Sequence, residues 1–264
     1  MRTGRKLLLL FVIAMLMLAS CSRSGGPAAP ADDELTVSAA ISLKDAFDEI
    51  GGLYTQKTGR KIVFNYGASG VLQKQIASGA PIDVFASAGD KQMNELSANG
   101  LILESTRRDF AGNRLVLIVP RNSQFDLSRF EDLGNEQINK IAVANPATVP
   151  AGQYTNELFA KKGLIESLRS KLILAENVRQ VLDYVIRDEV DAGIVYQTDA
   201  KAAGDSVRVC AFSTADDHDP IRYPIAVVAG SGSAGTAADF VEVVSSPEGR
   251  NILQKYGFDG PPKN

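Results

Sequence analysis

The sequence lacks the short motifs that identify several common classes of enzyme. It contains no Walker A phosphate loop, no H-E-x-x-H zinc motif, no C-x-x-C pair and no G-x-S-x-G nucleophile elbow. Histidine occurs once, as His218, inside the stretch Asp216-Asp217-His218-Asp219. These side chains are of metal-ligand types, so a metal site is one interpretation. A solvated acidic loop is the interpretation that we favour.

Positive charge is outnumbered by negative charge and forms no basic block, and this bears on the class of partner. The chain carries 28 Lys and Arg against 31 Asp and Glu, and setting aside the three basic residues of positions 1–20 leaves 25 against 31, or about −6. A mildly acidic body without a basic block argues against nucleic acid as a partner. It does not argue against a small anion, since local hydrogen-bond donors can outweigh a weak overall field.

The start of the chain predicts export and a lipid anchor. The apolar run over 7–18 follows basic residues and is shorter than the roughly 20 residues that a membrane-spanning helix needs. Leu18-Ala19-Ser20-Cys21 looks like a bacterial lipobox, in which the cysteine is lipidated. We expect a signal peptide over 1–20 and a lipid-anchored flexible linker over 21–33, which gives an extracytoplasmic, membrane-anchored lipoprotein in the periplasm or on the outer face of the cell membrane. An ordinary cleaved signal is the alternative.

If Cys21 carries lipid, the sequence excludes an intrachain disulfide, because Cys210 is then the only other cysteine. Cys210 lies in the apolar run Val207-Arg-Val-Cys-Ala-Phe212. A reactive thiol needs exposure and a basic neighbour. We therefore expect Cys210 to be a small buried hydrophobe.

Short apolar runs alternate with helical patterns over the rest of the chain, which predicts an α/β fold. Several runs are continuously apolar, as is typical of strands buried on both faces. The predicted strands cover 35–39, 61–66, 82–87, 114–119, 140–144, 171–175, 191–195, 206–212 and 223–229. The predicted helices run from Ser42 to a stop at Gly59, over 69–77, over 152–162, from Val178, and over 236–245.

Two serines stand where a predicted strand gives way to a predicted helix. Ser42 follows the first strand, and Ser69 follows the second strand between small residues that let a ligand approach the backbone. A helix start offers unpaired N–H groups and a partial positive charge, so it favours an anion. The simpler interpretation is that each serine is a plain N-cap, with Asp45 as a capping-box acid for the helix at Ser42.

Further junctions of the same kind follow along the chain. The loop over 145–152 and the segment over 175–178 each connect a predicted strand to a predicted helix. Tyr196 ends a predicted strand, and ligands of open α/β sheets gather beyond such strand ends. A rigid loop and ordinary packing are the simpler interpretations. The G-x-G-x-x-G motif over 230–235 predicts a flexible turn, because the rest of a dinucleotide-binding unit does not follow it.

With these residues in place, the chain resembles the extracytoplasmic molybdate-binding proteins of ABC importers over nearly all of its mature length. The matching segments are Ala39-Ala-Ile-Ser-Leu43, Tyr66-Gly-Ala-Ser-Gly70, Gly79-Ala-Pro-Ile-Asp-Val-Phe85, Val149-Pro-Ala-Gly152, Ala175-Glu-Asn-Val-Arg179, Gly193-Ile-Val-Tyr196 and Tyr223-Pro-Ile-Ala-Val-Val228. The resemblance implies a two-lobe periplasmic-binding-protein fold, type II-like, with the ligand cleft between the lobes. It places lobe 1 at 34–112 plus 224–264 and lobe 2 at 113–223.

The resemblance also implies the site and its role. Members of the family bind an oxyanion through two serines, the backbone N–H groups of an alanine and a valine, and a tyrosine. The matching positions are Ser42, Ser69, Ala151, Val178 and Tyr196. The implied function is capture of molybdate, and also of tungstate, for delivery to the permease and ATPase of an ABC importer. The resemblance further implies a monomer that has no cofactor and catalyses no reaction.

Alternatives remain at this point. A site made only of donors selects an oxyanion without a proton, which disfavours phosphate but leaves sulfate to be rejected by size. An amino acid would need a cation and an acid, and the five positions supply neither. A serine hydrolase using Ser42 or Ser69 would need a base, which the sequence does not place near either. Arg179 adds positive potential or forms an ion pair.

Overall fold

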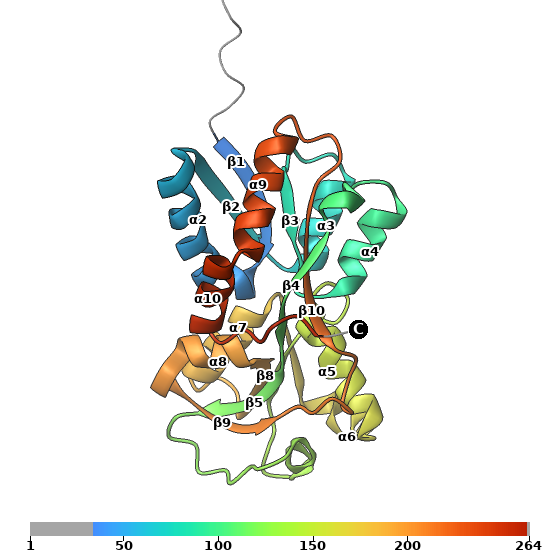
Figure 1. The fold of residues 1–264 in the computed structure, drawn as a ribbon. Coiled ribbons are helices and arrows are strands. Elements are labelled where there is room, and N and C mark those ends of the chain that lie inside the picture. Colours follow the sequence, from blue (N-terminus) through green and yellow to red (C-terminus); the bar gives the residue numbers. More distant parts are fainter. Residues whose placement is uncertain (1–33, 263–264) are drawn as a thin grey trace, which may run out of the picture. The chain divides into compact units, whose positions relative to one another are not determined.

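Two mixed β-sheets with flanking helices make up residues 34–262, the part of the chain that this computed structural model describes (Figure 1). The predicted α/β class is confirmed. The first sheet has the order β2-β1-β3-β10-β4, and the second has the order β7-β6-β8-β5-β9. We call the first sheet with its helices lobe 1 and the second sheet with its helices lobe 2. The predicted signal peptide over 1–20, the linker over 21–33 and Cys21 lie outside the described residues.

The strands and helices have the following bounds. The strands of lobe 1 are β1 (Glu34–Ala40), β2 (Lys61–Gly67), β3 (Val84–Ala86), β4 (Arg108–Asn113) and β10 (Ile221–Val227). Those of lobe 2 are β5 (Leu115–Pro120), β6 (Ile141–Ala144), β7 (Leu172–Ala175), β8 (Ala192–Tyr196) and β9 (Val207–Phe212). The α-helices are α2 (Lys44–Thr58), α3 (Ser69–Ala77), α4 (Asp90–Ala98), α5 (Pro150–Lys161), α6 (Ile165–Leu168), α7 (Val178–Ile186), α8 (Gln197–Ala203), α9 (Ala234–Ser245) and α10 (Pro247–Lys255). Short 3-10 helices are η1 (Ile41–Leu43), η2 (Glu104–Thr106), η3 (Phe130–Gly134), η4 (Arg169–Lys171) and η5 (Gly204–Ser206).

Parallel pairing brings the ends of particular strands together. In lobe 1, β1 and β2 pair in parallel from Glu34 with Lys61 to Ala40 with Gly67, so both strands end side by side. In lobe 2, β6 pairs in parallel with both β7 and β8. The carboxyl ends of these strands therefore meet at one edge of each sheet, which is where ligands of α/β proteins bind.

The chain passes between the lobes at two crossings. Asn113 ends β4 in lobe 1, and Leu115 begins β5 in lobe 2. The return lies between β9 and β10. We retain the lobe limits of 34–112 plus 224–264 and of 113–223 as a prediction.

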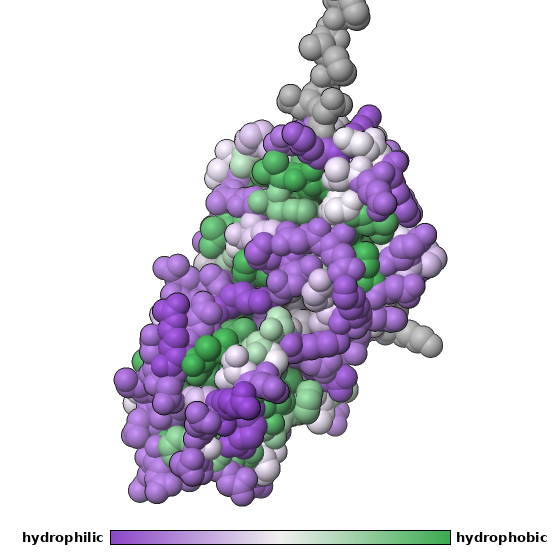
Figure 2. Space-filling view, turned by 90° about the vertical axis from the view of Figure 1, so that its left-hand side faces the viewer, coloured by the Kyte–Doolittle hydropathy of each residue, from purple (hydrophilic) through white to green (hydrophobic). Residues whose placement is uncertain are grey.

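Buried apolar side chains hold each sheet against its helices. Every residue of β5 is buried, as expected of a strand covered on both faces. In lobe 1, Phe47 of α2 packs edge-on against Phe240 of α9, with ring centroids 6.1 Å apart. The face of the molecule in Figure 2 is mainly hydrophilic, with separate hydrophobic groups, as is usual for a protein surface. No helix within 34–262 is long and apolar enough to cross a membrane.

The first predicted helix needs a correction. Residues 41–43 form the 3-10 helix η1, and the α-helix begins only at Lys44. Ser42 is not an N-cap: Ala40 and Leu43 occupy the cap positions, and neither helix has a side-chain cap bond. The stop at Gly59 is confirmed, with a left-handed φ of 73°.

Other elements were missed by the pattern of apolar residues. Strand β4 was not predicted, because Arg-Asp-Phe-Ala-Gly-Asn lacks a continuous apolar run. Helices α4, α8 and α10 were also missed, because polar residues make up most of each. The turn predicted over 230–235 connects β10 to α9, and α10 follows, so the segment is not part of a βαβ unit.

The expectation of a solvated loop at His218 is wrong. His218 is 5% exposed, and its two ring nitrogens bond to the Ser213 hydroxyl at 2.8 Å and to the Asp219 carbonyl at 2.7 Å. Its ring also packs against Tyr154.

Cys210 is half-buried, whereas we expected it to be fully buried, and burial raises the pKa of its thiol.

Two adjacent glycines of α2 provide a test of the packing. A Cβ at Gly51 would lie 2.7 Å from the Phe64 ring, whereas a Cβ at Gly52 would meet nothing within 4 Å. We expect Gly52→Ala to stabilise the fold by about 0.5–1 kcal/mol through helix propensity. Gly51→Ala should destabilise it by about 1–3 kcal/mol through overpacking. Urea unfolding of the two variants measures both effects, and equal midpoints would contradict the described packing.

Candidate functional site

One small cavity contains all five residues to which the sequence pointed. Its lining comes from both lobes and carries no charged side chain. The lining residues are Ala40, Ile41, Ser42, Gly67, Ala68, Ser69, Ala88, Val149, Pro150, Ala151, Val178 and Tyr196. The structure therefore brings Ser42, Ser69, Ala151, Val178 and Tyr196 together, and their role in binding stays a prediction.

Lobe 1 contributes the two serines through the register of β1 and β2. Because Ala40 is paired with Gly67, the residues that follow each strand lie next to one another. Ser42 then falls in η1, and Ser69 is the first residue of α3. Both are buried, at 4% and 1% exposure.

Lobe 2 contributes two helix starts and a strand end. Ala151 is the second residue of α5, directly after Pro150, and Val178 is the first residue of α7. Tyr196 is the last residue of β8 and the N-cap position of α8. These junctions follow the parallel strands β6, β7 and β8, so they share one edge of the sheet.

The starts of α5 and α7 leave backbone N–H groups without protein acceptors. A helix cannot pair its first N–H groups internally. Within 34–262, no backbone bond has the N–H of Ala151 or of Val178 as its donor. At α7 the Asn177 side chain caps a later residue, accepting from the Gln180 N–H at 3.0 Å. The two free N–H groups and the dipoles of both helices favour an anion in the cavity.

The serine hydroxyls do not cap their helices but bond elsewhere. Ser69 Oγ accepts from the Ala88 N–H at 3.1 Å, which leaves the hydroxyl proton of Ser69 available. Ser42 Oγ lies 3.1 Å from the Tyr223 hydroxyl. Ala88 and Tyr223 were missed by the sequence reasoning. The available signal for Ala88 was its position directly after the predicted strand over 82–87.

Tyr196 joins the two lobes. Its hydroxyl donates to the Ala88 carbonyl of lobe 1 at 3.0 Å. Burial raises its pKa well above the usual value, so the phenol stays neutral. Because a phenol has one proton, Tyr196 must release Ala88 before it can donate to a ligand.

Arg179, next to Val178, is held in ion pairs. Its guanidinium contacts Asp45 of α2 and lies 2.8 Å from the fully buried Asp199 of α8. Burial acts to lower the pKa of Arg179, but the carboxylates of Asp199 and Asp45 outweigh it and raise the pKa. The positive charge is thus neutralised beside the cavity, and the donors that line the cavity are hydroxyl and N–H groups.

The volume of the cavity is about 10 Å³, which is room for about one water molecule.

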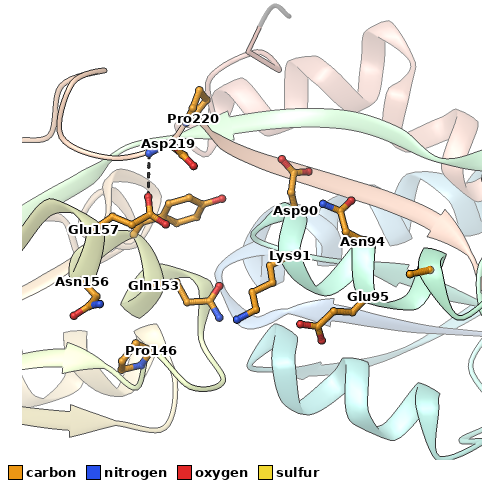
Figure 3. Close-up of a pocket in the computed structure, with 12 residues that line it drawn as sticks. Asp90, Lys91, Asn94, Glu95, Pro146, Gln153, Asn156, Glu157, Asp219 and Pro220 are labelled. Atoms are coloured by element: carbon orange, nitrogen blue, oxygen red, sulfur yellow. Dashed lines mark hydrogen bonds between the residues drawn. The ribbon is translucent and has the colours of Figure 1, made fainter. Parts of the chain in front are cut away.

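A larger cavity of about 750 Å³ lies between α4 and α5, and Figure 3 shows Lys91 extending from α4 toward Gln153 of α5. Carboxylates outnumber that single lysine in its lining, which disfavours an anion. The acidic residues are Asp90, Glu95, Glu157 and Asp219.

Neither a metal site nor a catalytic triad is present within the described range. No group of three or more metal-ligand side chains is found among residues 34–262. The Ser213–His218 pair lies outside the lining of the small cavity, and His218 Nδ1 bonds to a carbonyl instead of a carboxylate. The hydroxyl partners of Ser42 and Ser69 are a phenol and a backbone amide, neither of which is a base.

Comparison with known proteins identifies the family. The family described as bacterial extracellular solute-binding protein matches residues 35–259. A Bacillus subtilis protein described as a candidate ABC transporter substrate-binding lipoprotein is 38% identical over 251 residues, which are 93% of this chain and 94% of that protein. The molybdate-binding protein ModA of Haemophilus influenzae is 36% identical over 232 residues, which are 86% and 91% of the two chains. The chain belongs to the bacterial extracellular solute-binding protein family.

A solved structure agrees with this fold. The periplasmic molybdate-binding protein of Azotobacter vinelandii aligns with a TM-score of 0.79 over 86% of this chain and 100% of its own, at 23% identity. With the family match, this likeness confirms the predicted two-lobe periplasmic-binding-protein fold. The relatives also confirm the resemblance to molybdate-binding proteins, and they are solute-binding proteins rather than enzymes.

The buried carboxyl of Asp199 predicts a pH-dependent stability. Burial raises its pKa from 3.8 to about 6, so the folded protein holds this proton more tightly than the unfolded chain does. Protonated Asp199 makes its full contribution to the free energy of unfolding below about pH 4, and this contribution is lost as the pH rises through about 6. The amide in the Asp199→Asn variant is neutral at every pH. Between pH 4 and pH 7, the unfolding free energy of this variant should therefore rise by about 1–3 kcal/mol relative to that of the wild type. Urea unfolding across this range measures the difference, and parallel pH profiles would contradict the assignment.

Proposed function

We propose that this protein captures molybdate, and also tungstate, outside the cytoplasm and delivers it to an ABC importer. The observation that carries the proposal is the convergence of two serine hydroxyls and the free N–H groups of two helix starts on one uncharged cavity. The proposed ligand contacts are Ser42, Ser69, Ala151, Val178 and Tyr196. The identity of 36% with a molybdate-binding relative supports this choice of oxyanion.

Neutral donors are sufficient to hold a dianion in such a cavity. A hydrogen bond to a charged group contributes about 1.5–3 kcal/mol, roughly twice the contribution of a neutral bond. Two hydroxyls and two backbone N–H groups, acting where water is excluded, therefore sum to a tight site without a cationic side chain. Nothing in this arrangement activates a nucleophile, so we propose binding without catalysis and without a cofactor.

The donor set also determines which oxyanions fit. An oxyanion that still carries a proton needs an acceptor, and the cavity offers mainly donors. Molybdate and tungstate are unprotonated at neutral pH, whereas phosphate largely keeps one proton. Sulfate is unprotonated as well, and it remains the alternative ligand, because only size separates it from molybdate.

Binding must be coupled to a movement of the lobes. A tetrahedral oxyanion is larger than the one water for which the cavity has room, so the two halves of the lining have to separate for it to enter. The backbone already joins the lobes here, through the Gly70 N–H bond to the Thr148 carbonyl at 2.9 Å. A ligand that contacts both lobes shifts the equilibrium toward closure by its differential affinity for the closed state.

The proposed partners follow from the proposed role. We expect a permease and an ATPase of an ABC importer as partners, a monomer in solution, and attachment to the membrane through a lipid on Cys21. A relative described as a lipoprotein, at 38% identity, supports the anchor.

Molybdate should stabilise the purified protein. A ligand that binds only the folded state, at 100 times its Kd, adds about 2.7 kcal/mol, which raises Tm by about 5–10 °C for a chain of this length. Ser42→Ala and Ser69→Ala should each weaken molybdate binding by about tenfold to a hundredfold, because each removes a bond to a charged ligand. Titration calorimetry with molybdate, tungstate, sulfate and phosphate measures both affinity and selectivity.

A matched control is available in the same lobe. Ser38 of β1 is as buried as the two serines but bonds to Asn65 and does not line the cavity. Ser38→Ala should therefore leave molybdate affinity within about threefold of the wild type. Sulfate binding as tight as molybdate binding would overturn the ligand assignment.

A substitution at Gly70 tests whether the two lobes approach each other closely when molybdate is bound. A Cβ at Gly70 would lie 2.6 Å from the Thr148 carbonyl oxygen across the lobe boundary, whereas a Cβ at Gly232 would meet nothing within 4 Å. Gly70→Ala should weaken molybdate binding by at least about tenfold, because the added methyl group holds the lobes apart. Gly232→Ala should bind molybdate as the wild type does. Equal affinities of the two variants in calorimetry would show that the lobes do not close in this way.

A further inference from the structure

The hydroxyl of Tyr223 lies behind Ser42, outside the lining of the small cavity. Tyr223 belongs to β10 and is fully buried. Its Oη lies 3.1 Å from Ser42 Oγ and 3.2 Å from Asn113 Nδ2, at the end of β4. The side chain thus connects the strands that cross between the lobes to one of the proposed ligand contacts.

The orientation of the Asn113 amide is fixed by its other contacts. Its Oδ1 accepts the Arg114 backbone N–H at 2.9 Å, so its Nδ2 faces the opposite direction. Nδ2 then donates to Thr198 Oγ1 at 3.0 Å as well as to Tyr223 Oη. At Tyr223, Asn113 is therefore a donor and offers no acceptor.

The proton of Tyr223 consequently needs an acceptor elsewhere. Burial raises the pKa of the phenol, so the proton stays on Tyr223. The ring of Tyr196 packs nearby, but its hydroxyl donates to the Ala88 carbonyl at 3.0 Å. Among residues 34–262, the side-chain atoms with good hydrogen-bond geometry to Tyr223 Oη are Asn113 Nδ2 and Ser42 Oγ. Ser42 Oγ is the remaining partner. If Ser42 donated instead, a buried phenol proton would be left unpaired, which is costly.

The consequence falls on the hydroxyl of Ser42. Its oxygen accepts from Tyr223, so its own proton is left to point into the cavity. Ser69 reaches the same state by a different route, because its oxygen accepts from the Ala88 N–H. Both hydroxyls then face the cavity as donors, and each oxygen already accepts one hydrogen bond from the protein.

We propose that Asn113 and Tyr223 are positioning residues that hold the Ser42 hydroxyl as a donor and thereby exclude oxyanions that carry a proton. This inference rests on the proposed function of the cavity and names what determines its selectivity. The order of donation runs from Asn113 to Tyr223, from Tyr223 to Ser42, and from Ser42 to the oxyanion.

Tyr223→Phe removes the phenol and keeps the ring. We expect it to weaken molybdate binding by about tenfold, because Ser42 is then free to turn its proton away. The freed lone pair of Ser42 can also accept a hydrogen bond from the P–OH group of hydrogen phosphate, so phosphate should displace molybdate at a lower concentration than it does from the wild type. Tyr54→Phe is the control: Tyr54 is equally buried, and its hydroxyl bonds to the Thr236 carbonyl instead of a cavity residue.

A double-mutant cycle separates positioning from general stability. If Tyr223 acts through Ser42, adding Tyr223→Phe to Ser42→Ala should change molybdate affinity by less than about twofold. If Tyr223→Phe lowered molybdate affinity by the same factor in the Ser42→Ala background as in the wild type, the inference would be overturned. Unchanged displacement of molybdate by phosphate would also overturn it.

If the Tyr223→Phe variant does not fold, Asn113→Leu removes the donor to the phenol. This variant should show the same loss of molybdate affinity, and the loss should again depend on Ser42. A wild type that does not bind molybdate contradicts the proposed function itself, which distinguishes the two failures.

Discussion

The rest of this structure depends on backbone N–H groups that have no partner within their own helices. At the starts of α5 and α7 these groups border a buried cavity that has room for about one water. Buried N–H groups are almost always paired, so leaving these groups without an acceptor costs free energy that an entering acceptor recovers. The small residues around Ser69 let such an acceptor approach the backbone. A tetrahedral oxyanion has four oxygens and can therefore satisfy several of these groups at once.

Formal charge has a secondary role in this site. The cavity lining has no charged side chain, and Arg179 is neutralised by Asp45 and Asp199. A free cation would attract every anion, whereas directed hydrogen bonds distinguish anions by size, geometry and protonation. The pairing of Arg179 thus keeps positive charge from competing with the donors for control of selectivity. Selectivity among oxyanions then depends on the direction in which each serine hydroxyl points its proton. We have proposed that residues outside the cavity lining, Asn113 and Tyr223, fix this direction for Ser42.

Contacts at the cavity and directly around it also join the lobes. Tyr196 of lobe 2 bonds to Ala88 of lobe 1, Gly70 bonds to Thr148, and Arg179 contacts Asp45. Opening the site therefore breaks bonds around its rim, and a ligand can replace some of them. This arrangement makes capture and closure one event, because the energy of the ligand contacts is also the energy that holds the lobes together.

The sequence by itself determined the α/β class, most strand positions and the strand-to-helix junctions that border the cavity, because strand ends, helix starts and small residues are local features. The choice of five contact residues at those junctions came from the resemblance to molybdate-binding proteins. It did not reveal β4, whose residues lack an apolar run, or the burial of His218. Only the tertiary structure decided what Ser42 does: its partner Tyr223 is 181 positions away, and the asparagine that orients Tyr223 lies on another strand. Arg179 and Asp45 are 134 positions apart. Contacts at such separations depend on how the sheets pack, and no local pattern of residues carries that information.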